Sequence, residues 1–242
     1  MLFRMGDFYE MFHEDAREAS RLLGLTLTSR SHGKSSGEVP LAGVPHHAAE
    51  SYLAKLIRMG RKVAICEQVE DPKKAKGVVK RDVVEVVSPG TALADSILDG
   101  ERNNYAACLC PNGDHVGLAV VDISTGDFCL DELPLDELSD ELARLTPSEL
   151  ILSDTIPEDW PDGIQHTLPG LAISRLEQWQ FEYRHAYEIL TEQFHVHSLK
   201  GFDCEDLDLG VRAGGAALEY LRQNQRLSLI HISEPTRRTP IS

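Results

Sequence analysis

The stretch RMGDFYEMF, residues 4–12, stands near the start of the chain and combines helix-start signals with aromatic residues. Asp7 and Glu10 have the spacing of a capping box, in which each side chain accepts a hydrogen bond from a free backbone N–H of the first helical turn. Apolar residues then recur with a helical period until Gly24, which is a typical helix stop. The pattern predicts a helix over 7–23.

Phe8 lies inside this stretch and is open to two interpretations. In a helix it would meet Met11 and Phe12 at i+3 and i+4, so the local pattern favours a buried Phe8. The alternative is that Phe8 and Glu10 form a functional pair at an exposed tip. Local rules leave both interpretations open.

Strand and helix patterns alternate along the rest of the chain, which predicts two α/β domains. In the first part, the predicted strands are 25–30, 39–44, 62–69 and 78–87, and the predicted helix is 48–60. Further along, the predicted strands are 105–110, 115–124, 126–133 and 149–153, and the last predicted helix is 209–225.

Pro, Gly and polar residues interrupt these patterns after residue 87 and predict a linker. We therefore expect a first domain over 1–87, a linker over 88–103 and a second domain over 104–226. The tail, 227–242, lacks sustained periodicity and ends in Ser, Thr, Pro and Arg. We expect it to lie outside the fold, as a disordered or artefactual segment.

The formal net charge of −15 is distributed unevenly between the two predicted domains. Residues 1–87 contain 14 Lys and Arg against 12 Asp and Glu, a balance of +2. Residues 88–225 contain 7 against 26, a balance of −19. Because binding a nucleic acid requires cations that neutralise phosphates, such a partner is expected on the first domain only.

The composition is that of a globular protein, with 42% hydrophobic and 26% charged residues. No basic segment followed by an apolar run indicates a secretory signal, and the apolar runs are too short to predict a membrane helix. The cysteines show no C-x-x-C spacing, so we expect reduced thiols in a cytoplasmic protein. They are Cys66, Cys108, Cys110, Cys129 and Cys204.

Two motifs suggest catalytic or metal chemistry, and each lacks a required part. HGKS, residues 32–35, resembles the end of a phosphate-binding loop, but the first glycine of such a loop would stand at position 28, which is Thr28. The motif also precedes a strand pattern, whereas such a loop leads into a helix. Asp122 lies in a strand pattern, as in nucleases of the ribonuclease H type, but that chemistry needs several converging carboxylates. No catalytic residue and no metal ligand is predicted.

Basic residues occupy or flank loops of the first domain. They are Arg30, Lys34, Lys73, Lys74, Lys76, Lys80 and Arg81. Judged by their number alone, these residues are better explained as part of a solvated surface. The alternative is a set of phosphate contacts that position a duplex without reading its sequence.

RMGDFYEMF resembles the mismatch-recognition motif of MutS, a family of bacterial DNA mismatch repair proteins. Further segments resemble that family in the same order: PLAGVPHHAAESYLAKLIRMGRKVAICEQVEDP (40–72), VVEVVSPGT (83–91) and AVVDISTGDF (119–128). The resemblance extends over roughly residues 2–225. It implies a mixed-sheet α/β mismatch-binding domain, followed by a ribonuclease H-like α/β connector domain.

The resemblance implies roles for three residues. Phe8 would insert into the duplex beside a mispaired base, Glu10 would hydrogen-bond that base, and Arg30 would contact the DNA backbone. An inserted apolar side chain unstacks and kinks a base step, and a mispair is cheaper to deform than a matched pair. A carboxylate facing DNA is otherwise repulsive, so Glu10 is expected to select between base states.

The resemblance also implies what the second domain and the whole protein do. The connector domain would transmit signals and contact other mismatch repair proteins, and it would not be a nuclease. Full-length members would be homodimeric ATPases, with ATP and Mg²⁺ bound by portions that are absent here, so we expect no cofactor and no catalytic activity in this chain. The expected location is the bacterial cytoplasm, in association with the nucleoid.

The chain is expected to be an incomplete part of a larger protein. In the family, further residues normally precede the RMGDFYEMF motif, and the tail does not resemble the family. Two other functions remain open: a ribonuclease H-like metal-dependent nuclease, and a protein-interaction adaptor in which Phe8 belongs to the core.

Overall fold

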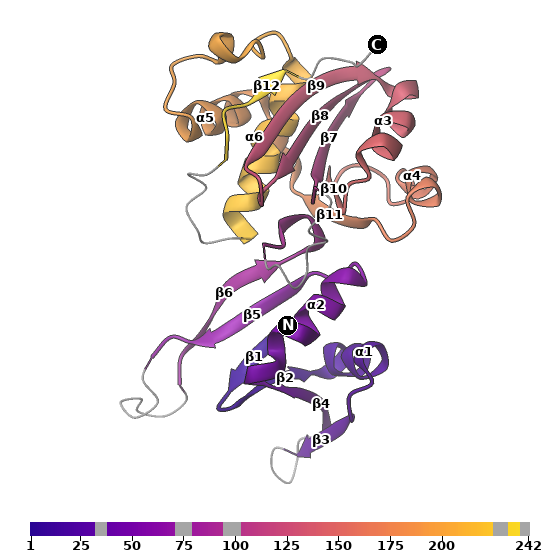
Figure 1. The fold of residues 1–242 in the computed structure, drawn as a ribbon, viewed down its shortest axis with the longest axis vertical. Coiled ribbons are helices and arrows are strands. Elements are labelled where there is room, and N and C mark those ends of the chain that lie inside the picture. Colours follow the sequence, from indigo (N-terminus) through magenta and orange to yellow (C-terminus); the bar gives the residue numbers. More distant parts are fainter. Residues whose placement is uncertain (32–37, 71–78, 94–102, 225–231, 238–242) are drawn as a thin grey trace. The chain divides into compact units, whose positions relative to one another are not determined.

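The computed structural model describes residues 1–31, 38–70, 79–93, 103–224 and 232–237. The chain divides into two compact units between Ser88 and Pro89, and each unit has a mixed β-sheet with helices packed against it (Figure 1). The predicted fold class, two α/β domains in succession, is confirmed. In the described residues, no helix is both long and apolar enough to span a bilayer.

The first unit contains a six-stranded sheet in the order β3-β4-β2-β1-β5-β6. β1 and β5 run parallel, and the other neighbouring strands pair antiparallel. The strands are β1 (Leu2–Met5), β2 (Phe8–Phe12), β3 (Thr28–Ser31), β4 (Glu38–Pro45), β5 (Val63–Gln68) and β6 (Arg81–Val87). The helices are α1 (His13–Leu23) and α2 (Ala49–Arg58), and the 3₁₀ turn η1 (His46–Ala48) precedes α2.

Both helices pack on one face of this sheet. Met11 of β2, Ala19 of α1 and Leu56 of α2 are buried around one small cavity. Along β2 the burial alternates, with Tyr9 and Met11 buried and Phe8 exposed. Because successive strand residues point to opposite faces, β2 presents Phe8 on the face that lacks the helices.

The helix predicted over 7–23 begins at His13 instead of Asp7. Residues 8–12 form β2, which pairs with β1 on one side and with β4 on the other. A short apolar run fits the period of a strand as well as that of a helix, and hydrogen bonds from two neighbouring strands decide for the strand. The capping-box interpretation of Asp7 and Glu10 is therefore wrong.

A tight turn at Gly6 and Asp7 joins β1 to β2. Gly6 has φ = +61°, and a two-residue hairpin loop of this kind requires a residue that tolerates positive φ at its first position. The turn pairs Met5 with Phe8 at the end of the hairpin. Phe8 is 47% exposed there, so the burial that the local pattern favoured is wrong.

The second unit also contains a six-stranded sheet, in the order β11-β10-β7-β8-β9-β12. β7, β8 and β9 form an antiparallel meander, whereas β10, β11 and β12 run parallel to their neighbours. The strands are β7 (Ala106–Asn112), β8 (His115–Asp122), β9 (Asp127–Pro134), β10 (Glu149–Ser153), β11 (Ala172–Leu176) and β12 (Thr236–Arg237).

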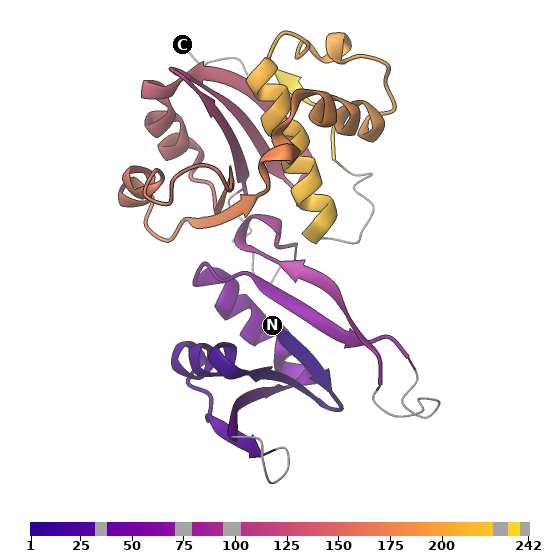
Figure 2. The ribbon, with the colours of Figure 1, turned by 180° about the vertical axis from the view of Figure 1, so that it is seen from behind.

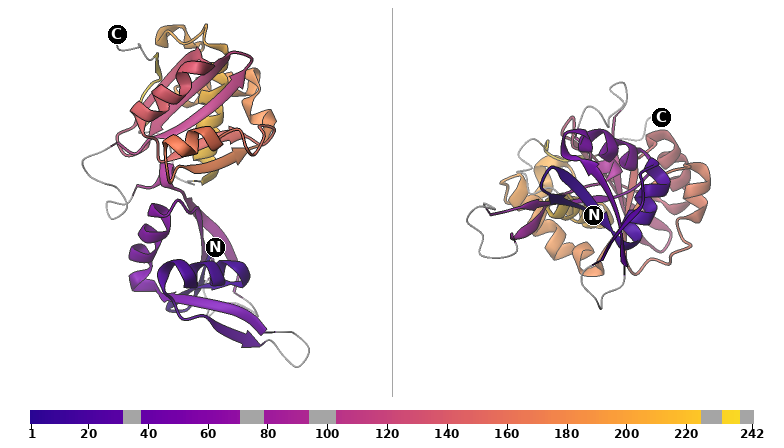
Figure 3. Two further views of the ribbon diagram at one scale, coloured as in Figure 1. Left: turned by 90° about the vertical axis from the view of Figure 1, so that its right-hand side faces the viewer. Right: turned by 90° about the horizontal axis from the view of Figure 1, so that it is seen from below.

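Helices cover both faces of this sheet (Figures 1 and 2). α3 (Leu138–Leu145) and α4 (Asp162–Thr167) pack on one face, and α5 (Tyr183–Gln193) and α6 (Asp208–Asn224) pack on the other. In the left view of Figure 3, α3 lies in front of the sheet and α6 behind it. The 3₁₀ turns are η2 (Pro89–Thr91), η3 (Leu135–Glu137), η4 (Gln178–Phe181) and η5 (Leu199–Phe202).

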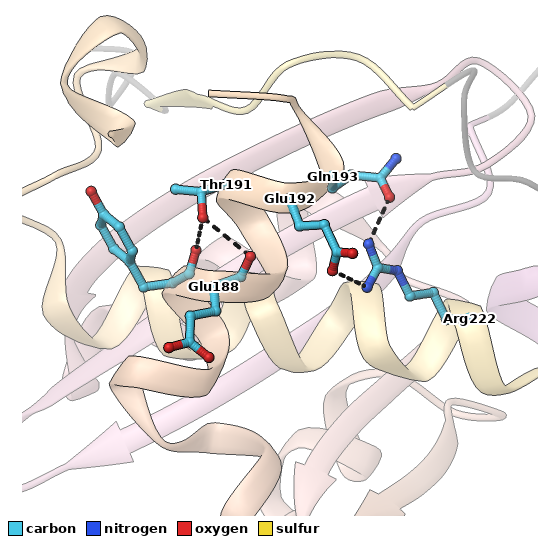
Figure 4. A network of polar contacts seen from close by, with 6 residues as sticks. Glu188, Thr191, Glu192, Gln193 and Arg222 are labelled. Atoms are coloured by element: carbon cyan, nitrogen blue, oxygen red, sulfur yellow. Dashed lines mark hydrogen bonds and ion pairs between the residues drawn. The ribbon is translucent and has the colours of Figure 1, made fainter. Parts of the chain in front are cut away.

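A polar network joins α5 to α6 at the surface (Figure 4). The guanidinium of Arg222 on α6 lies 3.5 Å from a carboxylate oxygen of Glu192 and donates a hydrogen bond of 3.2 Å to Gln193. On the same helix as these partners, the Thr191 hydroxyl donates to the carbonyl of Glu188 at 3.1 Å. Contacts of this kind at an exposed helix pair contribute little stability, about 0–1 kcal/mol each.

The strands predicted over 105–110, 115–124, 126–133 and 149–153 correspond to β7 to β10, and the last predicted helix corresponds to α6. We expected residues 227–242 to lie outside the fold. Within that range, Ile232 is buried in the hydrophobic core between the sheet and the helices α5 and α6. The strand β12 pairs with β9.

The segment that follows Ser88 is held on the second unit by a buried carboxylate. Glu149 accepts a hydrogen bond of 3.0 Å from the N–H of Gly90. The same carboxylate accepts hydrogen bonds from the hydroxyls of Ser174 (2.6 Å) and Tyr220. A buried carboxylate requires such donors, so this network fixes the first residues of the predicted linker.

Gly90→Ala should destabilise the second unit by about 1–3 kcal/mol, because overpacking forces neighbouring groups apart. An added Cβ would lie 2.7 Å from Ala106 Cβ and 2.8 Å from Glu149 Cβ. Both tryptophans of the chain, Trp160 and Trp179, lie in this unit, so their fluorescence during urea unfolding measures its stability.

Gly163→Ala is the matched control. Gly163 lies in α4, and a Cβ added there would have no atom within 4 Å. Alanine is the better helix former, so this variant should be as stable as the original or slightly more so. Equal unfolding midpoints for the two variants would contradict the close approach at Gly90.

Candidate nucleic-acid interface

The sheet of the first unit has a face that does not carry α1 and α2, which we call the open face. The strand registers place on it Phe3 and Met5 of β1, Phe8, Glu10 and Phe12 of β2, Arg30 of β3, and Val39, Leu41, Gly43 and Pro45 of β4. Apart from Phe8 and Arg30, which are exposed, these residues are half-buried. A largely apolar, partly exposed sheet face of this kind is typical of a binding surface.

Phe8 is the large apolar side chain of the open face that projects furthest into solvent. It is 47% exposed, although it lies on a strand that is paired on both sides. By contrast, Phe3 and Phe12 on the same face pack edge to face, with ring centroids 5.6 Å apart. Phe8 instead lies between Met5 and Pro45 in the strand register and, with nearly half of its surface exposed, adds little to the core.

Glu10 lies next to Phe8 on the same face, and its side chain is only 15% exposed. Its Oε2 atom is buried and has no hydrogen-bond donor in the described part of the chain. The guanidinium Nη1 of Arg30 lies 3.6 Å from that atom, which makes an ion pair but is too long for a hydrogen bond. The carboxylate therefore has a counter-ion, but its Oε2 atom can still accept a hydrogen bond.

Gly43 forms the floor between these two side chains. It pairs with Glu10 across β2 and β4. A Cβ built on Gly43 would lie 3.7 Å from Glu10 Cγ and 3.8 Å from Phe8 Cδ1, so both side chains lean over this residue. A Cβ would make only ordinary contacts there, whereas a longer side chain would occupy the space between Phe8 and Glu10.

Tyr9 fixes β2 from the opposite face. Its hydroxyl donates a hydrogen bond to the Glu67 carboxylate, and its ring stacks on His46 with centroids 5.6 Å apart. The Arg4 guanidinium lies 5.5 Å from the ring centroid. Burial and the hydrogen bond to Glu67 raise the pKa of Tyr9 to about 12. These contacts hold the residue between Phe8 and Glu10, so the open-face pair has a fixed spacing.

The structure thus brings together the three site residues predicted from the sequence, Phe8, Glu10 and Arg30, on one sheet face. Sequence reasoning missed Gly43 and Tyr9. For Gly43 a signal was available, since a glycine inside a strand pattern indicates close approach. For Tyr9 the partners are distant in sequence and no signal was available.

The other basic residues differ in what the structure shows of them. Arg81 donates a hydrogen bond of 3.1 Å to the Arg4 carbonyl, which ties β6 to β1. Lys80 is exposed. Lys34, Lys73, Lys74 and Lys76 lie outside the described residues, and so does the HGKS motif.

Asp122 has a structural role in the second unit. One carboxylate oxygen accepts from the backbone N–H (2.8 Å) and hydroxyl (2.6 Å) of Ser124, and the other accepts from the N–H of Asn104 (2.8 Å). In the described part of the chain, no group of three or more His, Cys, Asp or Glu side chains could hold a metal ion. The geometry gives the nuclease hypothesis no support.

Comparison with known families matches both units. The family model described as MutS domain I matches residues 1–96, and the one described as MutS domain II matches residues 104–233. The chain belongs to the MutS family. The resemblance inferred from its motifs is confirmed.

Three similar proteins carry the name DNA mismatch repair protein MutS. Those of Salinibacter ruber and Symbiobacterium thermophilum are each 46% identical to the chain over 237 residues, and that of Chlorobaculum tepidum is 44% identical over 236 residues. Each match covers 96% of the chain but only 26% or 27% of the relative. The chain therefore spans about a quarter of the length of these relatives.

Phe8→Ala should leave the first unit folded and change its stability by less than about 1 kcal/mol, because an exposed side chain contributes little to the core. Met11→Ala, on the opposite face of the same strand, should cost about 2–5 kcal/mol. All four methionines lie in this unit, so the methyl signals of labelled methionine in NMR spectra measure its unfolding in urea. A Phe8 variant as unstable as the Met11 variant would place Phe8 in the core.

Tyr9→Phe should change how the stability of the first unit depends on pH. The raised pKa of Tyr9 means that the fold requires the neutral phenol, so its contribution is complete below about pH 10 and is lost as pH rises towards 12. The variant lacks the Glu67 hydrogen bond and should be about 1 kcal/mol less stable at pH 8. The difference should narrow between pH 10 and 12 in urea titrations read by the same methionine signals, whereas parallel curves would contradict the assignment.

Proposed function

We propose that this chain is the part of a DNA mismatch repair protein that recognises mispaired or unpaired bases in duplex DNA. The exposure of Phe8 on a rigid strand carries the proposal. Phe8 inserts at a base step, and Glu10 accepts a hydrogen bond from the disturbed base. Both side chains come from one strand and rise from the same face, as simultaneous contact with one base requires.

The selectivity of this arrangement comes from the energy of deforming DNA. Unstacking a base step costs a few kcal/mol, and a mispaired step has already lost part of that stacking. Because the strand that carries Phe8 is paired on both sides, the DNA deforms on insertion and the protein does not. Phe8 therefore reads how easily the step opens, and it reads no particular sequence.

Glu10 adds a chemical criterion to this mechanical one. A carboxylate is repelled by phosphates, so it raises affinity only where a base offers it a donor. Its buried Oε2, which accepts no hydrogen bond within the described residues, is such an acceptor. Arg30 supplies positive charge beside it and is exposed enough to reach a phosphate.

We propose that the second unit, with its strongly acidic composition, contacts other mismatch repair proteins and not DNA. The homodimer and the ATP and Mg²⁺ chemistry that the resemblance implies are ascribed to portions of the full-length relatives outside these residues. We ascribe no catalytic role to the chain and place it in the bacterial cytoplasm, in association with the nucleoid. Neither a nuclease nor an adaptor with a buried Phe8 is favoured by a specific observation.

Fluorescence anisotropy with labelled duplexes tests the proposal. The 242-residue chain should bind a duplex with a G·T mispair or an unpaired T more tightly than a matched duplex at low salt, where phosphate contacts are strongest. A chimera in which the chain replaces the matching region of the Salinibacter ruber protein repeats the measurement in a full-length context. Phe8→Ala should reduce the preference about tenfold or more, equivalent to ~1.4 kcal/mol.

Arg17→Gln is the control, because Arg17 pairs with Glu14 on α1 and lies away from the open face. It should leave the preference unchanged. If neither the chain nor the chimera distinguishes a mispair, or if Phe8→Ala retains the full preference, the proposed function is wrong.

A further inference from the structure

The ion pair between Arg30 and Glu10 includes no hydrogen bond to the buried carboxylate oxygen of Glu10. Glu10 Oε2 is buried without a hydrogen bond, and Arg30 approaches it only to 3.6 Å. Arg30 stands on β3, the edge strand of the sheet, and its side chain is 47% exposed. The carboxylate is held in the site, and the guanidinium is free to leave it.

A phosphate group would bind Arg30 more strongly than Glu10 does. A guanidinium presents five N–H donors in a planar fork, which binds a phosphate through two parallel hydrogen bonds. Such paired, charge-assisted bonds are among the strongest polar contacts in proteins. Glu10 at 3.6 Å satisfies none of these donors. A phosphate close to the edge strand therefore competes for Arg30.

Arg30 cannot leave Glu10 without consequence. A buried carboxylate that loses its counter-ion pays the desolvation penalty of an unpaired charge unless another donor replaces the cation. A mispaired or unpaired base offers such a donor to Glu10. In a matched pair the corresponding donors are engaged with the partner base, so Glu10 has nothing to accept from.

We infer that Arg30 is a positioning residue that acts through Glu10, and that the pair exchanges partners when a mispair is bound. The inference rests on the proposed function. The exchange of partners has two coupled parts. The base takes over Glu10, and Arg30 passes to a phosphate. On matched DNA Arg30 stays with Glu10, and the phosphate contact is not made. The pair thus converts contact with a base into an additional backbone contact.

The coupled exchange of partners differs from an independent phosphate contact by Arg30 in its effect on the preference for mispaired over matched DNA. An independent Arg30 would strengthen binding to matched and mispaired duplexes alike, because phosphates are present in both. A coupled Arg30 strengthens only the mispaired complex. The mispaired complex should then release more counter-ions, so its slope of log K against log salt should be steeper by about 0.9 for one extra phosphate.

A double-mutant cycle on the chain and on the chimera tests the inference. Arg30→Gln should weaken binding of the G·T duplex about tenfold, change matched binding by less than about twofold and abolish the difference in salt slope. Glu10→Gln frees Arg30 from the start, so matched binding should tighten and the preference should fall. In the Glu10→Gln background, Arg30→Gln should weaken both duplexes by the same factor.

Two controls keep the result interpretable. Arg30→Lys keeps the charge and should retain part of the preference and of the slope difference, although Lys cannot make the paired contact. The methionine methyl signals should show that each variant is folded.

Equal weakening of both duplexes by Arg30→Gln in the original background would overturn the inference and make Arg30 an independent phosphate contact. That result would leave the proposed function intact, since the original protein would still prefer the mispair. Loss of preference in the original protein itself would sink the proposed function instead.

Discussion

The pairing of β2 with β1 on one side and β4 on the other is the constraint on which the candidate site depends. Because strand residues alternate between faces, this pairing sends Tyr9 and Met11 into the core and Phe8 and Glu10 to the open face. The core residues hold the strand, and the strand holds the pair at a fixed spacing. In a helix over the same residues, the two side chains would point in different directions and could not meet one base.

The two sheets differ in whether helices cover both faces, and this difference locates the candidate site. In β8 and β10 of the second unit nearly every residue is buried, because helices cover both faces. In the first unit the helices cover one face, and the burial along β2 alternates. The nearly neutral domain thus has the exposed sheet, and the strongly acidic domain has its sheet enclosed.

Sequence patterns predicted both α/β domains and most strands, because long apolar runs bounded by turn residues have few alternative structures. They failed at residues 7–12, where a short apolar run fits both periods and pairing with distant strands decides. The roles proposed for Phe8, Glu10 and Arg30 came from the family resemblance alone. The ion pair of Glu10 with Arg30 and the position of Gly43 under Phe8 depend on strand register, which no local pattern contains.

The open face reverses the polarity that folding alone favours. Phe8, which gains from burial, is 47% exposed, whereas Glu10, which loses hydration on burial, is 15% exposed and has an oxygen without a hydrogen bond. Exchanging these environments would stabilise the fold, since burying a phenylalanine contributes about 1.5–3 kcal/mol and an unsatisfied polar atom costs about 1–3 kcal/mol. Both departures lie on one face of one strand, beside a glycine that leaves the space between the two side chains open. A ligand with a flat apolar surface and a hydrogen-bond donor at its edge would satisfy both, and an unstacked base has that chemistry.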